Sequence, residues 1–255
     1  MSIRVEPTDS REVFEVAGRG ELQIGVLIET MRREGYEFSV SRPEIIPREI
    51  DGKSCEPVED VLTEVPEGYA GSVMEKLSIR RGRLVSMEPR GDRMHLHFVV
   101  PSRGLFGYRG EFLTDTRGEG ILNRTVKGYE PHAGPLEGRG VGAIVATELG
   151  KTTPYALFHI QERSTLFVPP GTPVYEGQIV GENRRAGDLN VNVCRQKKLT
   201  NVRAAGKDEA TVVTPPRPLT IESALEWIED DELLEVTPKE LRLRKRVLAG
   251  SQRKR

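Results

Sequence analysis

The first 47 residues alternate between apolar and polar positions and then change to a helical spacing. Residues 3–7 and 12–18 alternate with a period of two, as short strands do. In residues 20–36 the apolar side chains recur at three and four positions, which predicts a helix. A further alternation at 37–43 predicts another strand. The predicted order is therefore strand, strand, helix, strand.

Residues 48–132 carry a longer series of strand and helix patterns. Segments of period two flank two segments of helical spacing, and glycines or prolines separate them. The predicted order is strand, helix, strand, strand, helix, strand, over residues 56–66, 70–82, 83–89, 93–101, 104–118 and 120–131. This order is typical of the ferredoxin-like arrangement, an antiparallel sheet with both helices on one face. The first block repeats its last four elements, so we expect the opening strand and helix in a longer parent chain.

Residues 133–255 differ, because short apolar runs recur there between closely spaced glycines and prolines. Strands are predicted over residues 140–149, 155–163, 165–170, 177–182 and 188–194. An acidic helix follows at 220–233, with Thr220 and Ser223 as candidate N-caps, and a last strand at 240–248. The predicted fold class is α+β in three parts: an incomplete ferredoxin-like domain (1–47), a complete one (48–132), and a mainly β domain with one or two helices (133–255).

Composition limits the class of protein. Of the 255 residues, 36% are hydrophobic and 30% are charged, so we expect small cores and a highly charged surface. The two cysteines, Cys55 and Cys194, lack the spacing of a disulfide framework or a zinc ribbon and suit a reducing compartment. No apolar run approaches the roughly 20 residues of a membrane span, and the N-terminus lacks the apolar region of a signal peptide. We expect a soluble cytoplasmic protein with no membrane partner.

One short motif suggests a nucleotide site but lacks the required spacing. The run Gly150-Lys151-Thr152 is similar to the end of a phosphate-binding loop, in which backbone amides hold the phosphates. Val145 stands where that loop needs its first glycine, and Pro154 follows almost at once. We therefore predict no nucleotide site here.

A second candidate is the pair His95 and His97, whose rings share one face of a predicted strand and could bind a metal ion. No third ligand is near them in the sequence. We favour a polar sheet face there, with Met94, Leu96, Phe98 and Val100 turned to the core. The acidic run 229–232 is interpreted as a solvated helix end. We predict no catalytic residue, no cofactor and no metal site in this chain.

Positive charge is concentrated in two segments, although the net charge is −1. Residues 183–203 carry six lysines and arginines against Asp188 alone, and the last strand adds more. Such segregation focuses the field on one face, and each cation placed on a phosphate releases counterions. Aromatic residues are scarce in these segments, so we expect contacts to the backbone and 2′-hydroxyls of folded RNA and little base stacking. The candidate RNA-binding residues are Arg184, Arg185, Arg195, Lys197, Lys198, Arg203, Arg242, Arg244, Lys245 and Arg246. A solvated surface loop without a ligand is the alternative.

Several stretches resemble translational GTPases. Residues 18–49, which begin "GRGELQIG", resemble the third domain of elongation-factor-G-type proteins, and residues 99–120, with "GLFGYRGEF", resemble their fifth domain. Residues 174–210, with "GENRRAGDLNVNVCRQKKL", are similar to the C-terminal domain peculiar to the BipA/TypA family, as are "ALEWIEDDELLEVTP" and "LRLRKR". The resemblance covers essentially the whole chain.

This resemblance implies a ribosome-associated parent GTPase that acts in translation regulation, ribosome assembly and stress response. Its nucleotide-binding domain, which would hold GTP and Mg²⁺, and a β-barrel domain would lie upstream. The implied partners are large-subunit ribosomal RNA and A-site tRNA, with a monomeric protein. The family's basic loop toward the peptidyl transferase centre corresponds to about 183–203, which carries over Arg184, Arg185, Arg195, Lys197 and Lys198. Gln196 stands where the family more usually has glycine.

Two other functions stay open at this point. Paired ferredoxin-like domains also serve as regulatory modules that bind small ligands such as amino acids. A metal hydrolase built on His95 and His97 is an enzymatic alternative. Since the chain lacks a phosphate-binding loop, we expect it neither to bind nor to hydrolyse GTP.

Overall fold

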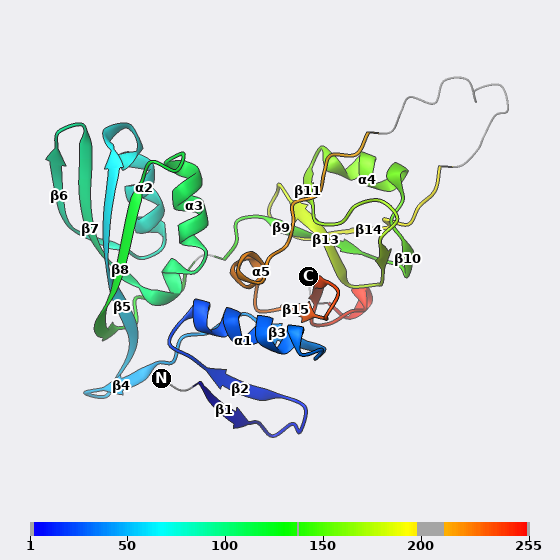
Figure 1. Ribbon diagram of the computed structural model, residues 1–255, viewed down its shortest axis with the longest axis horizontal. Helices are drawn as coiled ribbons and strands as arrows, with labels where there is room; N and C mark the ends of the chain where they lie inside the picture. Colours follow the sequence, from blue (N-terminus) through cyan, green and yellow to red (C-terminus); the bar gives the residue numbers. More distant parts are fainter. Residues whose placement is uncertain (1–2, 137, 198–211, 254–255) are drawn as a thin grey trace. The chain divides into compact units, whose positions relative to one another are not determined.

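The computed structural model describes residues 3–136, 138–197 and 212–253, which form two compact units (Figure 1). Residues 43–138 make one of them, here called the central unit. Residues 1–42 and 139–255 together make the other, here called the split unit. Both units contain helices packed on sheets, so the predicted α+β class is confirmed.

The central unit is an antiparallel sheet with helices against one face. Its elements are β4 (Arg48–Ile50), β5 (Lys53–Pro66), α2 (Glu67–Ile79), β6 (Arg83–Arg90), β7 (Arg93–Pro101), η1 (Ser102–Leu105), α3 (Tyr108–Asp115) and β8 (Ile121–Pro131). The strand order is β4-β5-β7-β6, and β8 also pairs with the long β5. From β5 to β8 the elements follow each other as the alternation of residues 48–132 predicts.

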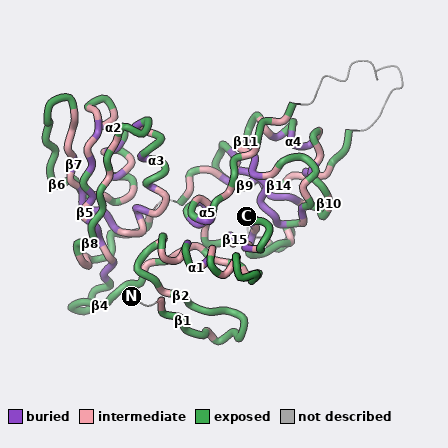
Figure 2. The backbone as a smooth tube through the Cα atoms, in the orientation of Figure 1, coloured by how far each residue is buried: buried purple, intermediate pink, exposed green. Residues whose placement is uncertain are grey.

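The two faces of this sheet differ because side chains alternate along each strand. Leu96, Phe98 and Val100 of β7 are buried in the core beside α2 and α3. On the other face, Nε2 of His97 lies 2.7 Å from Oδ1 of Asp60, and both side chains are partly exposed. The edge strand β6 is exposed along its whole length (Figure 2). The prediction that the histidines belong to a polar sheet face is confirmed.

The split unit has one larger sheet and two small two-stranded sheets. Its elements are β1 (Arg4–Pro7), β2 (Phe14–Ala17), α1 (Glu21–Arg33), β3 (Phe38–Ser41), β9 (Gly142–Ala146), β10 (Gly150–Lys151), α4 (Pro154–Gln161), β11 (Ser164–Leu166), β12 (Pro173–Val174), β13 (Gln178–Asn183), β14 (Leu189–Val191), α5 (Ile221–Trp227), β15 (Glu232–Val236), β16 (Leu241–Lys245) and η3 (Gly250–Gln252). The main sheet has the order β14-β9-β13-β16-β15-β3, with β11 on β13. The pairs β1-β2 and β10-β12 are separate two-stranded sheets.

At its strand β9 this main sheet is buried on both faces. In β9, Ala143 and Val145 belong to one core with residues of α1 and α5, and Ile144 and Ala146 belong to a second core with residues of α4. All residues of β9 are buried. A strand covered on both sides reads as a continuous apolar run, which is how "GAIVA" appears in the sequence.

The N-terminal residues share this architecture. β3 pairs antiparallel with β15, and Val40 lies opposite Leu234 in the register. Ile28 of α1 is 3% exposed and lies in the same core as Leu234 and Val236. The segment before residue 43 therefore contributes an edge strand and a covering helix to the split unit.

The strand predicted at residues 155–163 is wrong, because these residues form the helix α4. Thr153 is its N-cap, with Oγ1 accepting from the backbone N–H of Ala156 at 3.1 Å, and a proline occupies the start of the first turn. Ala156, Leu157 and Ile160 are buried, at spacings of a helical face. Threonine followed by proline is a helix-start signal, and it outweighs the short alternation seen in the sequence.

The helix predicted at 220–233 begins where expected but ends early. Thr220 is the N-cap, as predicted, whereas Ser223 stands at N3 and completes a capping box with it. The helix α5 ends at Trp227, and β15 starts at Glu232. The acidic run 229–232 therefore covers the end of the connection and the first residue of β15, which corrects its interpretation as a helix end.

Candidate nucleic-acid interface

The predicted cations of residues 183–203 surround the turn after β13. Arg184 and Arg185 are exposed in the turn between β13 and β14, and Arg195 and Lys197 are exposed beyond β14. The two other predicted positions, Lys198 and Arg203, lie outside the described residues. The structure thus brings Arg184, Arg185, Arg195 and Lys197 to the surface on the segments that flank β14.

The backbone of this turn is tightly fixed. Asn183 Nδ2 donates to the carbonyl of Gly187 at 2.8 Å, and the N–H of Gly142 donates to the carbonyl of Arg185 at 2.8 Å. A Cβ atom on Gly142 would lie 1.7 Å from the carbonyl oxygen of Gly187, so only glycine fits there. Arg184 also donates from Nη1 to the carbonyl of Glu162 at 2.9 Å. The arginines therefore project from a rigid backbone.

The cations predicted in the last strand are mostly paired with carboxylates. Arg242 donates to Glu240 at 3.1 Å, and Nε of Arg244 lies 2.9 Å from Oε1 of Glu235. The Arg244 side chain is only 19% exposed. Arg246, directly after β16, is exposed. Of this group, Arg246 presents its charge most openly.

Lys245 is buried, which corrects its place among the predicted RNA contacts. Its side chain is 3% exposed, and Nζ lies 2.6 Å from Asp188, 2.9 Å from Asp231 and 2.8 Å from Glu232. An ammonium group enclosed by three carboxylates cannot reach a phosphate. Its charge instead offsets acidic groups inside the fold.

Glu232 extends this cluster to the start of β9. Its side chain is fully buried and accepts from Nη1 and Nη2 of Arg139 at 3.0 and 3.1 Å. The Arg139 guanidinium also lies 3.5 Å from the ring centroid of Trp227. Glu229 accepts from Nη1 of Arg42 at 2.9 Å. The acidic run therefore supplies ion-pair partners, and the predicted solvated character is wrong for Glu232, whereas Asp230 and Asp231 are exposed.

Asp188 connects the buried cluster to the arginine turn. Besides the ion pair with Lys245, its Oδ1 accepts from the N–H of Ala143 at 2.9 Å. Burial tends to raise the pKa of the Asp188 carboxyl, but the hydrogen bond and charge of Lys245 and the amide of Ala143 outweigh it, so the pKa lies below its ordinary value. For Lys245, burial tends to lower the pKa, while the carboxylates around it raise the pKa above its usual range.

Helix α4 is bonded to the chain on both sides of residues 198–211, that is, to residues 193–195 before them and to residues 212–214 after them. At its N-terminus, Thr153 Oγ1 donates to the carbonyl of Arg195 at 2.6 Å, and the Thr153 N–H donates to the carbonyl of Val193 at 3.0 Å. At its C-terminus, Gln161 donates from Nε2 to the carbonyl of Val212 at 3.1 Å and accepts from the N–H of Thr214 at 2.9 Å. Figure 1 shows α4 between these two limbs. The eight residues of α4 set the two limbs roughly 12 Å apart along its axis.

Sequence reasoning missed the residues that hold the interface in place. The Thr153-Pro154 pair was a usable signal, because it marks a helix N-terminus. Arg139 and Glu232 are 93 positions apart, so no local pattern could pair them. The partners of a buried charge become visible only when the chain is folded.

The other sequence candidates have structural roles. Gly150 and Lys151 form the short strand β10, and Thr152 is 2% exposed and donates from Oγ1 to the carbonyl of Pro169 at 2.8 Å. Across the described residues, no three His, Cys, Asp or Glu side chains gather in a way that could hold a metal ion. Within the same ranges, none of the helices has the length and hydropathy needed to cross a membrane.

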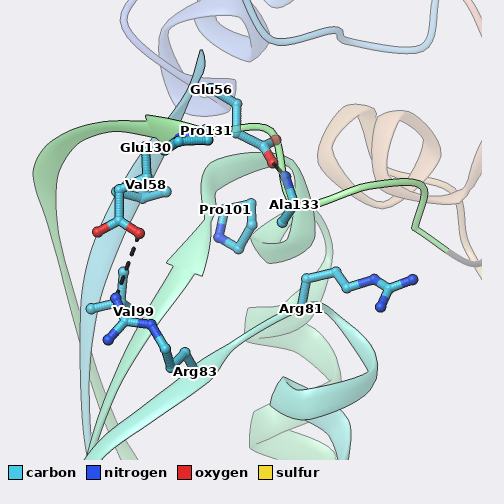
Figure 3. A pocket seen from close by; sticks show the side chains of 9 residues that line it. All are labelled: Glu56, Val58, Arg81, Arg83, Val99, Pro101, Glu130, Pro131 and Ala133. Atoms are coloured by element: carbon cyan, nitrogen blue, oxygen red, sulfur yellow. Dashed lines mark hydrogen bonds and ion pairs between the residues drawn. The ribbon is translucent and has the colours of Figure 1, made fainter. Parts of the chain in front are cut away.

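The central unit contains a small hollow that bears on the small-ligand alternative (Figure 3). Its volume is about 220 Å³, and it is lined by Glu56, Val58, Arg81, Arg83, Val99, Pro101, Glu130, Pro131 and Ala133. Glu56 is buried, with its carboxylate paired to Arg103 and to the N–H of Ala133. Arg83 reaches Glu130 at 3.5 Å, and Arg81 donates to a backbone carbonyl. The charged groups here already have protein partners, so the hollow offers no observation in favour of an amino-acid site.

Comparisons with known proteins match two successive parts of the chain. The family model described as the TypA/BipA C-terminal domain matches residues 141–250, and that described as the elongation factor G C-terminus matches residues 53–139. A Bacillus subtilis (strain 168) protein named "Large ribosomal subunit assembly factor BipA" is 51% identical over 100% of this chain and 42% of its own length. A protein of the same name from Escherichia coli (strain K12) is 49% identical with the same coverage. The chain thus spans 42% of the length of these curated relatives.

A solved structure from Thermus thermophilus is also similar to part of the chain. It shares 26% sequence identity over 31% of this chain and 12% of its own, with a TM-score of 0.30. Because that TM-score is low, this likeness carries no argument about the fold.

Replacing Gly142→Ala should destabilise the split unit by about 1–3 kcal/mol, because the new methyl group forces β9 away from the turn at Gly187. Trp227 is the chain's only tryptophan and lies in this unit's core, so its fluorescence during urea unfolding measures the change. Gly140→Ala is the matched control, because a Cβ there meets nothing within 4 Å. Equal midpoints for the two variants would contradict the tight contact.

Replacing Lys245→Met should lower the free energy of unfolding by about 3–5 kcal/mol, because it removes the buried cation that pairs with the fully buried Glu232 and with Asp188 and Asp231. Arg246→Met, one residue on, removes an exposed charge and should change it by less than about 0.5 kcal/mol. Urea titration followed by Trp227 fluorescence compares the two. A loss for Lys245→Met no larger than for Arg246→Met would rule out the enclosed cluster.

The same cluster predicts a stability plateau between about pH 4 and pH 10, the ordinary ranges of Asp and Lys. The lowered pKa of Asp188 gives stability that is present above its unfolded value and is lost as the pH falls. The raised pKa of Lys245 gives stability that is present below its unfolded value and is lost as the pH rises through the folded value. Asp188→Asn should flatten the acid limb of the Trp227 unfolding profile, and an unchanged acid limb would be the contrary result.

Proposed function

Because this chain belongs to the TypA/BipA family, we propose that it is the ribosome- and tRNA-docking portion of a translational GTPase. The relatives that match it along its whole length are named as large ribosomal subunit assembly factors. The proposed role is to place cations of the split unit on ribosomal and transfer RNA. The observation that carries it is the exposure of Arg184, Arg185 and Arg195 around a backbone that the fold holds rigid.

The rigidity of this backbone supports RNA docking as the role of its charges. A cation on a mobile chain loses conformational freedom when it meets a phosphate, whereas the turn at 184–187 is already fixed by Gly142 and Asn183. Arginine also presents a planar set of donors that suits phosphate oxygens. The proposed partners are large-subunit RNA and A-site tRNA, contacted mainly through phosphates and 2′-hydroxyls.

The remaining assignments follow from the same family relation. Residues 48–132 are proposed as a ferredoxin-like domain of the elongation factor G type, residues 133–255 as the family-specific domain, and residues 1–47 as part of a further domain. The parent protein would bind GTP and Mg²⁺ and hydrolyse GTP in its N-terminal domain. The chain itself is proposed to act by binding alone, as a monomer in the cytoplasm.

Reversing Arg184, Arg185 and Arg195 to Glu should weaken binding of the chain to large ribosomal subunits, because phosphate contacts release counterions. Each lost contact should also reduce the slope of log affinity against log salt by about 0.7–0.9. Sedimentation with purified large subunits at several salt concentrations gives both quantities. Reversing the exposed Arg4, Arg11 and Arg19 of the N-terminal segment is the control with the same change in net charge.

Equal effects of the two triple variants would mean that net charge alone governs binding, and the proposed interface would be wrong. Wild-type chain that fails to bind large subunits at low salt would contradict the docking function itself. Variants should keep the wild-type unfolding midpoint, since all the replaced side chains are exposed.

A further inference from the structure

The outward face of α4 carries three aromatic rings beside the arginine turn. The ring centroids of Tyr155 and His159 lie 4.5 Å apart and those of Phe158 and His159 lie 5.8 Å apart, both in edge-to-face orientation. Phe158 is 40% exposed, and His159 is exposed as well. The three rings therefore lie next to one another along the helix, with Tyr155 partly buried, and are here called the α4 aromatic face.

The helical period explains why these rings face outward. Positions 155, 158 and 159 lie on one side of the helix, whereas Ala156, Leu157 and Ile160 are buried. Leu157 and Ile160 belong to the core beneath the helix. Since that core already anchors α4, the outward rings are not required to hold the helix to the sheet. Apolar ring surface is less favourable in water than when buried, so this face would gain free energy from covering by a ligand.

Positive charge borders this face at both ends. At the C-terminal end, Arg184 bonds to the carbonyl of Glu162, and Arg163 is exposed directly after it. At the N-terminal end, Thr153 holds the carbonyl of Arg195, whose residue is exposed. Among the helix residues and their two caps, all of them described, Glu162 is the one carboxylate. The surroundings fit a ligand with flat apolar parts and negative charges between them.

Building on the RNA docking proposed above, we propose that the α4 aromatic face binds unpaired nucleotides of the RNA. A base stacks on the exposed ring of Phe158, and the flanking phosphates meet Arg184 and Arg195. Unpaired nucleotides combine both chemistries, whereas the bases of a duplex are stacked on each other and present only phosphates and sugars. The sequence predicts little stacking, because the basic segment itself contains no aromatic residue. The fold changes this expectation, because it places the aromatic residues of 155–159 near Arg184 and Arg195.

The test uses the whole chain with two RNA probes. One is a 12-nucleotide single-stranded oligoribonucleotide with a central 2-aminopurine, a base whose fluorescence reports stacking, and the other is a fully paired RNA duplex of the same length. Phe158→Ala should weaken binding of the single strand about 5- to 150-fold, the range expected for one stacked base. Binding of the duplex should stay unchanged.

Three further variants separate stacking from other effects. Phe158→Trp keeps an aromatic surface and should restore single-strand binding, while Phe158→Leu keeps an apolar side chain of similar size and should behave like Phe158→Ala. Tyr36→Ala removes another exposed aromatic residue, 56% exposed, and should have no effect. Equal binding by Leu and Trp variants would point to an apolar protein contact and would overturn the inference.

The outcomes also separate this inference from the docking function. If Phe158→Ala leaves single-strand binding and the 2-aminopurine signal unchanged while Arg184, Arg185 and Arg195 are still needed for large-subunit binding, the inference fails and docking stands. If the arginine variants bind large subunits normally, the docking proposal fails independently of Phe158.

Discussion

The split unit depends on the enclosure of one lysine by carboxylates. Lys245 ends β16, Glu232 begins β15, and Asp188 precedes β14, so their contacts join three strands and the arginine turn at one point. Arg139 joins the segment before β9 to the same cluster, because its guanidinium forms a bidentate ion pair with Glu232. Removing charges from water is costly, and the cost is offset only when every charge finds a partner in good geometry. The arrangement therefore admits few alternatives, and it fixes where the β13–β14 turn lies.

The same ion pairs also decide which cations of this nearly neutral chain are buried and which stay exposed. Acidic residues that follow α5 pair with Lys245 and Arg139 inside the fold and with the partly exposed Arg42, and Glu235 pairs with Arg244 on the sheet. Arg184, Arg185 and Arg195 remain exposed. Positive charge remains in excess at this turn because Asp188, the one carboxylate among residues 183–203, pairs with Lys245.

Helix α4 supplies the second constraint on the interface. One face of the helix closes a core of the main sheet, and its two ends hold the limbs around residues 198–211 through Thr153 and Gln161. Its remaining face presents aromatic rings next to arginines. This short helix therefore links the packing of the core to the distance between the two chain segments that it holds. Phosphate and base recognition would use neighbouring surfaces on a single rigid support.

The sequence by itself determined the order of elements in residues 48–132 and the core and polar faces of β7, because alternation along a strand is a local property. It also located the basic segment, since charge can be counted along the chain. It failed at α4, where a helix-start signal was overlooked, and it could not separate Lys245 from Arg246, which are neighbours with opposite exposure. Which cation is buried depends on carboxylates far away in the sequence, such as Asp188, and on the strand register that brings them near. Only the tertiary structure decided that, because pairing a buried charge is a contact between distant segments and leaves no pattern in either of them.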